Sequence, residues 1–546
     1  MSRTAPRAPF AAAFAAPFAT RLATRLAGRV AALAVIALTL AGCASLPTEV
    51  VRTESFARPP VHTSPIVRLA NSAALPHGKT GVWPMPGAGF ALDARVALIR
   101  NAVSTLDLQY YLLGNDEVGH TILRELRLAA ERGVRVRLLV DDMHTPGLDP
   151  LLAGLHATPN AQVRLFNPFP SGRDSQGARY LGLLFDFSRL NHRMHNKAFI
   201  ADGAMAVIGG RNLADEYFFR SREGNFIDID FVVAGEVTSQ LGRLFDEYWN
   251  SEEAYPVDAV VRPDSAPAEL RQAFVRATTP ATPPAETKPA ARDMLGQPTL
   301  TAVLAGTAPL SMHVADASAW ADSPQKARGS AAKQKQRESV TVKFVQALRT
   351  AQKEVLVFNP YFIPGSRGMA SIRQLRERGI DIHIVTNSMS TSDEPIVNLA
   401  YRRYRDELLS LGVRIFELTD DGLKREARFA DVLGESKGQL HAKLALVDRH
   451  TVMAGSMNLD ARSAFANTEI GVVMKSPDLA ARILPLMQLD RFPGVYEVRR
   501  SAEGGKLEWV SRDGSEERKR DTDPDGNWYQ RFKVMIQSLF IHEDIL

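Results

Sequence analysis

Apolar and polar positions follow the same order in two separate stretches of the chain. The first stretch has a helix-like segment at 96–103 and a strand-like segment at 106–112, and a longer helical segment then ends at Gly133. The second stretch starts at residue 344 and repeats this order, with its long helical segment ending at Gly379, 246 residues after Gly133. Glycine readily adopts the left-handed conformation that ends many helices. Because helices alternate with strands, we expect an α/β protein of two fused halves with pseudo-twofold symmetry, built on mixed, mostly parallel sheets flanked by helices.

Changes in composition mark the limits of these halves within the 546-residue chain. Residues 261–335 are rich in alanine, proline, threonine and serine, which favours a flexible linker over a packed core. We therefore place a first domain at 81–260 and a second domain at 336–546. Residues 43–80 are expected to form a tether with little regular structure of its own.

The N-terminus has the layout of a secretory signal. Residues 1–29 contain five arginines and no acid, and an apolar run at 30–40 is followed by Ala41, Gly42 and Cys43. This run is too short to span a bilayer core, which needs about 20 apolar residues. We therefore predict that residues 1–42 are a signal peptide.

Cys43 is the only cysteine, so the chain cannot form an internal disulfide. Its setting resembles the lipobox of bacterial lipoproteins, which implies a lipid anchor at a membrane surface facing the periplasm. Ala44 slightly favours the outer membrane. The alternatives are an uncleaved apolar anchor and a cysteine that serves only as a small buried residue.

The net charge of +5 is concentrated in the same N-terminal segment, because its five arginines are not balanced by acids. The remainder of the chain is close to neutral, which argues against an extended basic surface for nucleic acid. We therefore expect no nucleic-acid partner, and the oligomeric state stays open.

Each half contains one copy of the pattern H-x-K-x4-D, and the two copies are again 246 residues apart. A histidine and a lysine two positions apart project from the same face of a strand, and the aspartate falls at a turn before a second apolar strand. Two copies at the spacing of the structural repeat indicate a shared site. The copies consist of His195, Lys197 and Asp202 in the first half, and of His441, Lys443 and Asp448 in the second.

Small residues follow the second strand of each copy and indicate anion binding. Glycine or serine lets an anion approach the backbone N–H groups at the start of a helix, and asparagine adds a side-chain donor. Two such copies facing each other would hold one phosphoryl group from both sides. The residues concerned are Gly210 and Asn212 in the first half, and Ser456 and Asn458 in the second.

These groups together predict phosphodiester chemistry through a phosphohistidine. One imidazole attacks phosphorus, the other protonates the leaving oxygen, and lysine and asparagine side chains stabilise the charge on the phosphoryl oxygens. Water or an alcohol then opens the intermediate. We expect neither a cofactor nor a metal: His192 lies three residues before His195, but no second cysteine or H-E-x-x-H pattern completes a zinc site.

Acidic residues near the motifs are candidates to support the histidines. Glu469 lies in an apolar segment, where a buried carboxylate needs a partner such as a histidine. In the first half either Asp228 or Asp230 corresponds to it, with a slight preference for Asp228. Asp202 and Asp448 belong to the motifs, but their place at turns favours a structural role.

The doubled H-x-K-x4-D-x6-G-[GS] plan resembles the phospholipase D superfamily over residues 80–546. The segments around both motifs, together with Trp320-Ala-Asp-Ser-Pro-Gln-Lys and the closing Ile541-His-Glu-Asp-Ile-Leu, resemble its cardiolipin synthase C branch. The resemblance implies two phospholipase D-like domains that share one active site. It also implies that His195 is the nucleophile and His441 the general acid and then base, that Glu469 orients a histidine, and that the motif aspartates are structural.

From this resemblance we expect a phosphatidyltransferase that acts on phospholipid substrates. The expected reaction moves a phosphatidyl group from one phospholipid to a hydroxyl of another, so that phosphatidylglycerol and a second phospholipid form cardiolipin and glycerol or ethanolamine leaves. The alternatives are hydrolysis of phospholipids to phosphatidic acid by the same fold, a nuclease, and a lipid-binding scaffold without activity. Both motifs are intact, which argues against the scaffold.

Overall fold

The computed structural model describes residues 46–263, 265–280, 291–328, 339–425, 433–487, 495–501, 505–513 and 516–524. The predicted signal peptide, Cys43 and the closing segment at 541–546 lie outside these residues, as do parts of the predicted linker. The described residues from Glu49 onward belong to one compact unit. The domain limits proposed from composition stay predictions.

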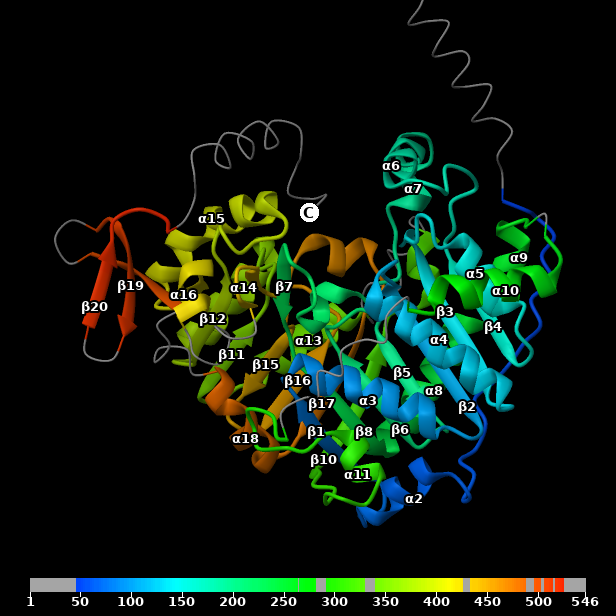
Figure 1. Cartoon of the computed structure of the whole chain (residues 1–546). Helices are drawn as coiled ribbons and strands as arrows, with labels where there is room; N and C mark the ends of the chain where they lie inside the picture. The colour runs from blue at the N-terminus through cyan, green and yellow to red at the C-terminus, as the bar shows by residue number, and fades with distance from the viewer. Residues whose placement is uncertain are drawn as a thin grey trace, which may run out of the picture. The chain divides into compact units, whose positions relative to one another are not determined.

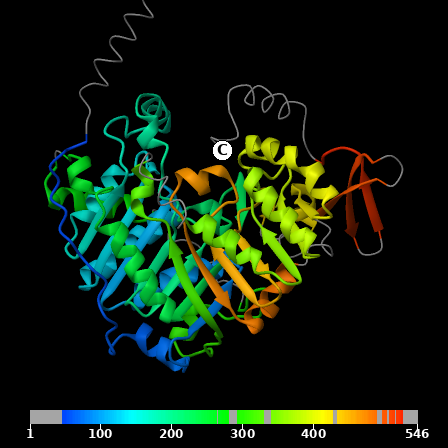
Figure 2. The same cartoon turned by 180° about the vertical axis from the view of Figure 1, so that it is seen from behind.

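Eighteen strands of the described residues form one mixed sheet that runs through both halves (Figures 1 and 2). In the first half the strands are β1 (Thr80–Met85), β2 (Thr105–Leu112), β3 (Arg135–His144), β4 (Ala161–Phe166), β5 (Ala198–Ala201), β6 (Met205–Gly209), β8 (Asp230–Gly235) and β9 (Ala254–Pro256). The others are β10 (His313–Ala321), β11 (Glu354–Phe358), β12 (Asp381–Asn387), β13 (Arg414–Leu418), β15 (Leu444–Val447), β16 (Thr451–Gly455), β17 (Ile470–Lys475), β18 (Val495–Arg500), β19 (Leu507–Asp513) and β20 (Glu516–Arg520). β7 (Gly224–Ile227) and β14 (Lys437–Leu440) form a separate two-stranded sheet.

The strand order is pseudo-symmetric about a central pair, β1 and β10. Hydrogen bonds give β9-β4-β3-β2-β5-β6-β8-β1 on one side of this pair. They give β10-β17-β16-β15-β11-β12-β13-β18 on the other side, followed by β19 and β20. The two fused halves expected from the repeated pattern are therefore present, and they share one sheet.

Helices cover both faces of this sheet. The larger ones are α3 (Ala88–Asn101), α4 (Glu117–Glu131), α6 (Gln176–Phe185), α8 (Glu236–Trp249), α10 (Pro267–Thr278), α13 (Val340–Arg349), α14 (Gly365–Glu377), α15 (Pro395–Ser410) and α18 (Pro477–Met487). Shorter ones are α2 (Pro65–Ser72), α5 (Asp149–His156), α7 (Phe187–Leu190), α9 (Val257–Val260), α11 (Leu300–Leu304), α16 (Asp420–Arg425), η1 (Asp215–Phe218), η2 (Pro324–Arg328) and η4 (Arg462–Ala466). Gly133 and Gly379 end α4 and α14 with φ of 96° and 77°, as their positions predict.

Alternate residues of each strand face two different cores. In β5, Phe199 and Ala201 lie in a core with residues of α3 and α4, whereas Ala198 and Ile200 lie in a core with residues of α8. The core that includes α8 also contains Leu446 of β15 and residues of α18. One apolar layer therefore continues through both halves. This shared core fixes the position of one motif relative to the other.

The sheet is mixed, as expected, but the expectation of mostly parallel pairing is wrong. Among the described strands, parallel pairs join β2, β3 and β4 in one half, β11, β12 and β13 in the other, and β7 with β14. The remaining described pairs are antiparallel. Helical crossovers follow only the early strands of each half, whereas β5 and β15 continue through tight turns into β6 and β16, and such turns require antiparallel pairing.

Two segments expected to lack structure are part of the fold. Within 261–335, β10 pairs with β1 on one side and with β17 on the other, so it joins the two halves of the sheet. Residues 43–80 include α2, and the Ser64 hydroxyl donates to the Asp202 carboxylate over 2.6 Å. The average composition of these segments does not reveal either feature, because one strand or one short helix needs only a few ordered residues between prolines.

Candidate active site

The histidine–lysine pairs lie in extended segments just before β5 and β15, not inside these strands as the alternation predicts. The backbone N–H of His195 donates to the carbonyl of Thr468 over 2.9 Å, and that of His441 donates to the carbonyl of Ile227 over 2.8 Å. Each of these bonds joins a motif to the opposite half of the chain. The two motifs are thereby brought to one site.

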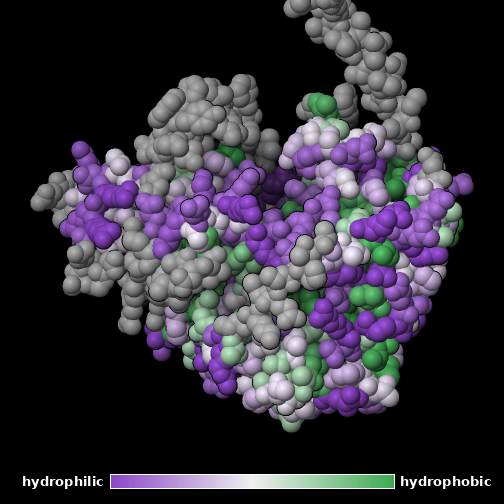
Figure 3. Space-filling model, viewed as in Figure 1, coloured by the Kyte–Doolittle hydropathy of each residue, from purple (hydrophilic) through white to green (hydrophobic). Residues whose placement is uncertain are grey.

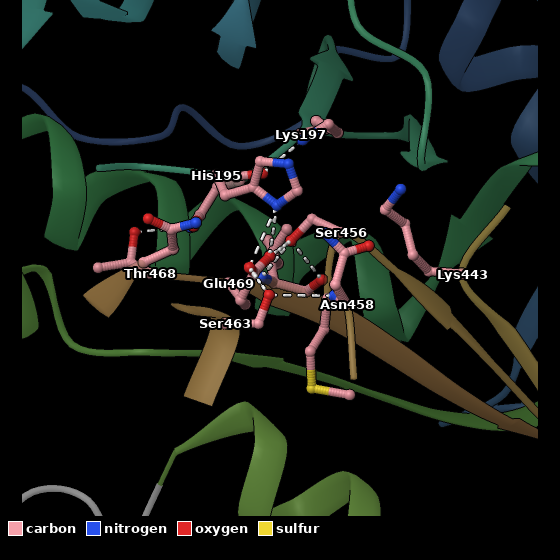
Figure 4. Close-up of polar contacts among 12 residues, drawn as sticks. His195, Lys197, Lys443, Ser456, Asn458, Ser463, Thr468 and Glu469 are labelled. Carbon is pink, nitrogen blue, oxygen red and sulfur yellow. Dashed lines mark hydrogen bonds and ion pairs between the residues drawn. The ribbon is translucent and has the colours of Figure 1, made fainter. Parts of the chain in front are cut away.

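Each histidine ring is held by a carboxylate from the opposite half. Nδ1 of His195 lies 3.0 Å from Oε2 of Glu469, and Nδ1 of His441 lies 2.7 Å from Oδ2 of Asp228. All four residues are buried. Figure 4 shows the first pair. When Nδ1 donates its proton to the carboxylate, the lone pair of the neutral ring is on Nε2, which is left for chemistry.

Serine and glycine at equivalent positions accommodate the two acids differently. Glu469 accepts hydrogen bonds from the hydroxyls of Ser456 and Ser463, the latter over 2.7 Å (Figure 4). Gly210 stands where the second half has Ser456, and a Cβ there would lie 2.6 Å from Oδ1 of Asp228. The N–H of Ser456 donates to a strand carbonyl, so the expected anion contact through it is wrong. These two residues position the acids.

The two asparagines also differ. Asn212 donates to the Tyr217 hydroxyl over 2.8 Å, and the Tyr217 ring packs edge-on against His441 with the centroids 5.1 Å apart. Asn212 thus supports the wall of the site. Oδ1 of Asn458 is buried and has no hydrogen-bond partner among the described residues, and Figure 4 shows Asn458 close to Ser456. An acceptor oxygen does not bind a phosphate oxygen, so the donor for the expected contact is the Nδ2 amide of Asn458, and this contact stays a prediction.

Lys197 and Lys443 reach the site from opposite halves (Figure 4). Nζ of Lys197 donates to the carbonyl of His195 over 2.7 Å, and Nζ of Lys443 donates to the carbonyl of His441 over 2.6 Å. Burial lowers the pKa of Lys197 to about 7 and that of Lys443 to about 8, although nearby carboxylates oppose the shift. Both amines retain substantial positive charge at neutral pH.

The histidine rings are neutral in the free site at pH 7. Burial lowers the pKa of His195 to about 4, against the opposing effect of Glu469. Burial and the charges of Lys443 and Lys197 hold the pKa of His441 well below its ordinary value. A phosphodiester anion placed between the lysines offsets their charge and raises the pKa of both rings.

The motif aspartates lie at the turns and do not contact the histidines. Asp202 accepts hydrogen bonds from the backbone N–H of Ser104 (2.8 Å) and Thr105 (2.9 Å) at the start of β2. Asp448 accepts from the backbone of Lys353 over 2.8 Å, next to the start of β11. Both aspartates have positive φ, 50° and 52°, which aspartate tolerates in turns. These contacts agree with the structural role that the sequence favours for Asp202 and Asp448.

Of the two acids left open in the first half, Asp228 is the one that contacts a histidine. Asp230 is paired instead with Arg95 over 2.8 Å and lies 3.5 Å from Arg211. The sequence could not separate the two, because they are two positions apart and their segment leaves the strand pattern between β7 and β8.

Comparison with known proteins adds to this geometry. A family model described as "Cardiolipin synthase, PLD-like domain" matches residues 96–249 and 344–488, one match in each half. The chain belongs to this family.

Relatives agree with this assignment over most of the chain. Cardiolipin synthase C of Escherichia coli (strain K12) is 34% identical over 488 residues, which cover 88% of this chain and 100% of that protein. A cardiolipin synthase of Staphylococcus aureus (strain Mu50 / ATCC 700699) is 25% identical over 392 residues, which cover 72% of this chain and 63% of that protein. Among solved structures, the phosphatidylserine synthase of Haemophilus influenzae Rd KW20 aligns with a TM-score of 0.48 and 15% identity, covering 77% of this chain and 88% of that one. The resemblance to phospholipase D-like proteins is confirmed, and the chain is a phosphatidyltransferase of this type.

Aromatic residues of this family member complete the walls of the site and were not predicted. The Tyr111 ring packs edge-on against His195 with the centroids 4.9 Å apart, and its hydroxyl lies 2.8 Å from Nε2 of His144. Phe226 lies 4.8 Å from the His441 ring. Tyr111 is the residue before the last one of β2, in a strand that the sequence predicts, and this place near the carboxyl end of a parallel strand was the available signal.

Two properties of the described residues concern metals and membranes. Histidine, cysteine, aspartate and glutamate side chains there form no group of three suited to a metal ion. Within the same residues, no helix combines the length and apolarity needed to cross a bilayer.

Proposed function

We propose that the protein forms cardiolipin from phosphatidylglycerol and a second phospholipid, by transferring the phosphatidyl group of one lipid to a hydroxyl of the other. The observation that carries this proposal is the crossed arrangement in which Glu469 holds His195 and Asp228 holds His441. Two imidazoles, one to attack and one to transfer a proton, and two amines then share one buried site, as a two-step phosphoryl transfer requires. The similarity to cardiolipin synthase C over the whole of that relative supports the choice of substrates.

In the first step His195 attacks and His441 acts as an acid. Nε2 of His195 forms a bond to phosphorus, and the bond from phosphorus to the oxygen of the leaving headgroup alcohol, glycerol or ethanolamine, breaks. Nε2 of His441 gives its proton to that oxygen, since the bound anion has raised the pKa of its ring. Glu469 stabilises the positive charge that develops on His195, and Asp228 stabilises protonated His441.

In the second step the roles of acid and base are reversed. His441, now neutral, takes the proton of the acceptor hydroxyl while the acceptor oxygen attacks phosphorus. The bond between phosphorus and Nε2 of His195 breaks, and both rings return to their starting state. Lys197, Lys443 and Asn458 contact the phosphoryl oxygens through both steps.

The test is to incubate the purified protein with labelled phosphatidylglycerol, with and without phosphatidylethanolamine. Labelled cardiolipin is the expected product, and phosphatidic acid alone would replace the proposal with hydrolysis. His195→Ala and His441→Ala should each abolish turnover. His450→Ala is the matched control, because His450 is exposed on the surface of the second half and should tolerate the change.

We further propose that residues 1–42 are removed and that Cys43 carries a lipid which holds the protein at the periplasmic side of a membrane, with the outer membrane favoured. The support is the arginine-rich, apolar and small-residue order of this segment. Cells fed a clickable fatty acid should label the wild-type protein and not Cys43→Ser. Equal labelling of the two would contradict the proposal.

A further inference from the structure

Helix α6 has its polarity inverted relative to an ordinary surface helix, and α7 exposes an apolar side chain beside it. Arg179 of α6 is fully buried, whereas its neighbours Tyr180 and Leu181 are 53% and 61% exposed. Phe187 of α7 is 49% exposed. Figure 1 shows α6 and α7 projecting from the body at the top of the view, and Figure 3 shows hydrophobic atoms at this tip beside a recess in the surface. An amphipathic surface helix normally buries such apolar side chains and exposes arginine.

The base of this projection is tied firmly to the end of β3. Asp142 pairs with Arg173 and lies 3.4 Å from Arg179, and the neighbouring Asp141 pairs with Arg193 over 2.9 Å. The Arg179 and Arg193 guanidinium groups also lie 5.3 and 5.4 Å from the centroid of the Phe169 ring. The charged side chains therefore form ion pairs and ring contacts within the base of the projection. The tip is left apolar by a built arrangement and not by loose packing.

The projection leads directly into the catalytic segment. Leu190, the last residue of α7, precedes His195 by five residues, which span at most about 17 Å of extended chain. The Arg462 side chain of the second half donates to Oδ1 of Asn191 over 2.8 Å, so this connection is also fixed. The base of the projection therefore lies within about 17 Å of His195, and the tip stands beside the recess that Figure 3 shows.

We propose that Tyr180, Leu181 and Phe187 form an insertion tip that enters the interfacial region of a phospholipid bilayer and places the active site at the membrane surface. This rests on the proposed function, in which phospholipids must pass from a bilayer to His195. Leucine with aromatic residues is a composition suited to the boundary between headgroups and acyl chains.

A protein partner fits the insertion tip less well. A stable protein interface buries about 800 Å² on each side. Three side chains offer at most about 150–250 Å² each, and half of that surface is already covered here. Insertion into a bilayer does not require a minimum interface area, because each apolar side chain that enters adds its own transfer free energy.

The first experiment reports on insertion without using activity. An environment-sensitive fluorophore is attached through Leu181→Cys and, as the matched control, through Phe56→Cys. Phe56 is 58% exposed, and its carbonyl accepts from Arg135 at the opposite end of β3 from Asp141 and Asp142. The wild-type chain labelled in the same way gives the background from Cys43. Vesicles of phosphatidylglycerol and phosphatidylethanolamine should shift the emission to the blue at position 181 and not at position 56.

Two results of that experiment would overturn the proposal. One is an emission at position 181 that vesicles leave unchanged. The other is a blue shift that follows protein concentration without lipid, which would assign the tip to contact with a second copy of the chain. Neither fluorescence result depends on whether the protein makes cardiolipin. A failure of the insertion proposal is therefore distinct from a failure of the proposed function.

The second experiment uses the double variant Leu181→Ser/Phe187→Ser with Phe56→Ser as control. On vesicles the double variant should lose kcat/KM by about tenfold or more, since two apolar contacts are removed. On short-chain phosphatidylglycerol dispersed below its micelle concentration it should match the wild type. Equal loss on both substrates, or no loss on either, would overturn the proposal, and Phe56→Ser should leave both rates unchanged.

Discussion

Glu469 lies 274 residues after His195, yet its carboxylate holds the ring of that histidine at 3.0 Å. The reverse connection, from Asp228 to His441, makes the relationship mutual. Each half of the chain thus supplies the acid that the other half needs. From the crossed pairs we predict how variants of the positioning residues differ from variants of the residues that form bonds to phosphorus.

Replacing Glu469 with glutamine should reduce kcat strongly. The amide keeps contact with the Ser456 and Ser463 hydroxyls but cannot stabilise the charge that attack places on His195. We expect kcat to fall on the order of 10⁴-fold, as when a catalytic histidine elsewhere has its carboxylate partner replaced by an amide. Initial rates of cardiolipin formation give the measurement. Glu435→Gln, at an exposed glutamate, is the matched control, and a Glu469→Gln variant with wild-type kcat would refute this role.

Gly210→Ala should disable the site while leaving the fold intact. The added Cβ would lie 2.6 Å from Oδ1 of Asp228, so the carboxylate must move away from His441. We expect kcat to fall by about 10²-fold or more, with a melting temperature close to that of the wild type. Gly177→Ala is the control, because a Cβ there meets nothing within 4 Å. Equal activity of the two variants would contradict the packing argument.

The pH dependence of kcat/KM should be bell-shaped for the free enzyme. Activity should rise as pH increases through about 4, where His195 loses its proton and becomes nucleophilic. It should fall on the alkaline side because the free His441 ring must take up a proton before it can act as the acid, and it should fall further above about 7 to 8, where Lys197 and then Lys443 lose the positive charge that binds phosphate. Lys197→Arg retains its charge over this range, so its remaining activity should show a weaker decline on the alkaline side. A wild-type profile that stays flat to pH 9 would exclude this assignment.

Asp202→Ala should lower stability more than catalysis. Its carboxylate accepts from the buried backbone of Thr105 and from Ser64, and these donors would lose their partner. We expect the free energy of unfolding to fall by about 2–3 kcal/mol, and that of the more exposed Asp448→Ala by about 1 kcal/mol. Denaturant unfolding gives these values, and kcat per folded molecule should stay within about twofold of the wild type. A large loss of kcat at unchanged stability would restore a catalytic role.

Much of the fold was predictable because the repeat at 246 residues carries both the helix ends and the motifs. The pairing of strands was less accessible: β10 lies in a segment whose composition suggests a linker, and only its hydrogen bonds to β1 and β17 show that it joins the halves. The turn role of the motif aspartates followed from their position after a strand. Composition thus described the average of a segment and missed the few ordered residues that matter.

The chemistry of the site was predictable as a set of groups but not as a set of contacts. The sequence shows that Glu469 needs a partner, but the spacing within a half says nothing about which histidine it reaches. It also suggests that Gly210 and Ser456 bind phosphate. In the structure Gly210 makes room for Asp228, and the Ser456 hydroxyl donates a hydrogen bond to Glu469. Contacts between residues more than 200 positions apart depend on how the halves meet, which local patterns do not encode.

The unequal surroundings of the two histidines have a consequence for the duplication itself. In a dimer of identical subunits around an exact axis, both rings would have the same neighbours and the same affinity for a proton. Fusion into one polypeptide removes that constraint, since glycine with aspartate serves one ring and serine with glutamate serves the other. Selection can then tune one imidazole for attack and its counterpart for proton transfer, a division of labour that two copies of one gene product cannot make.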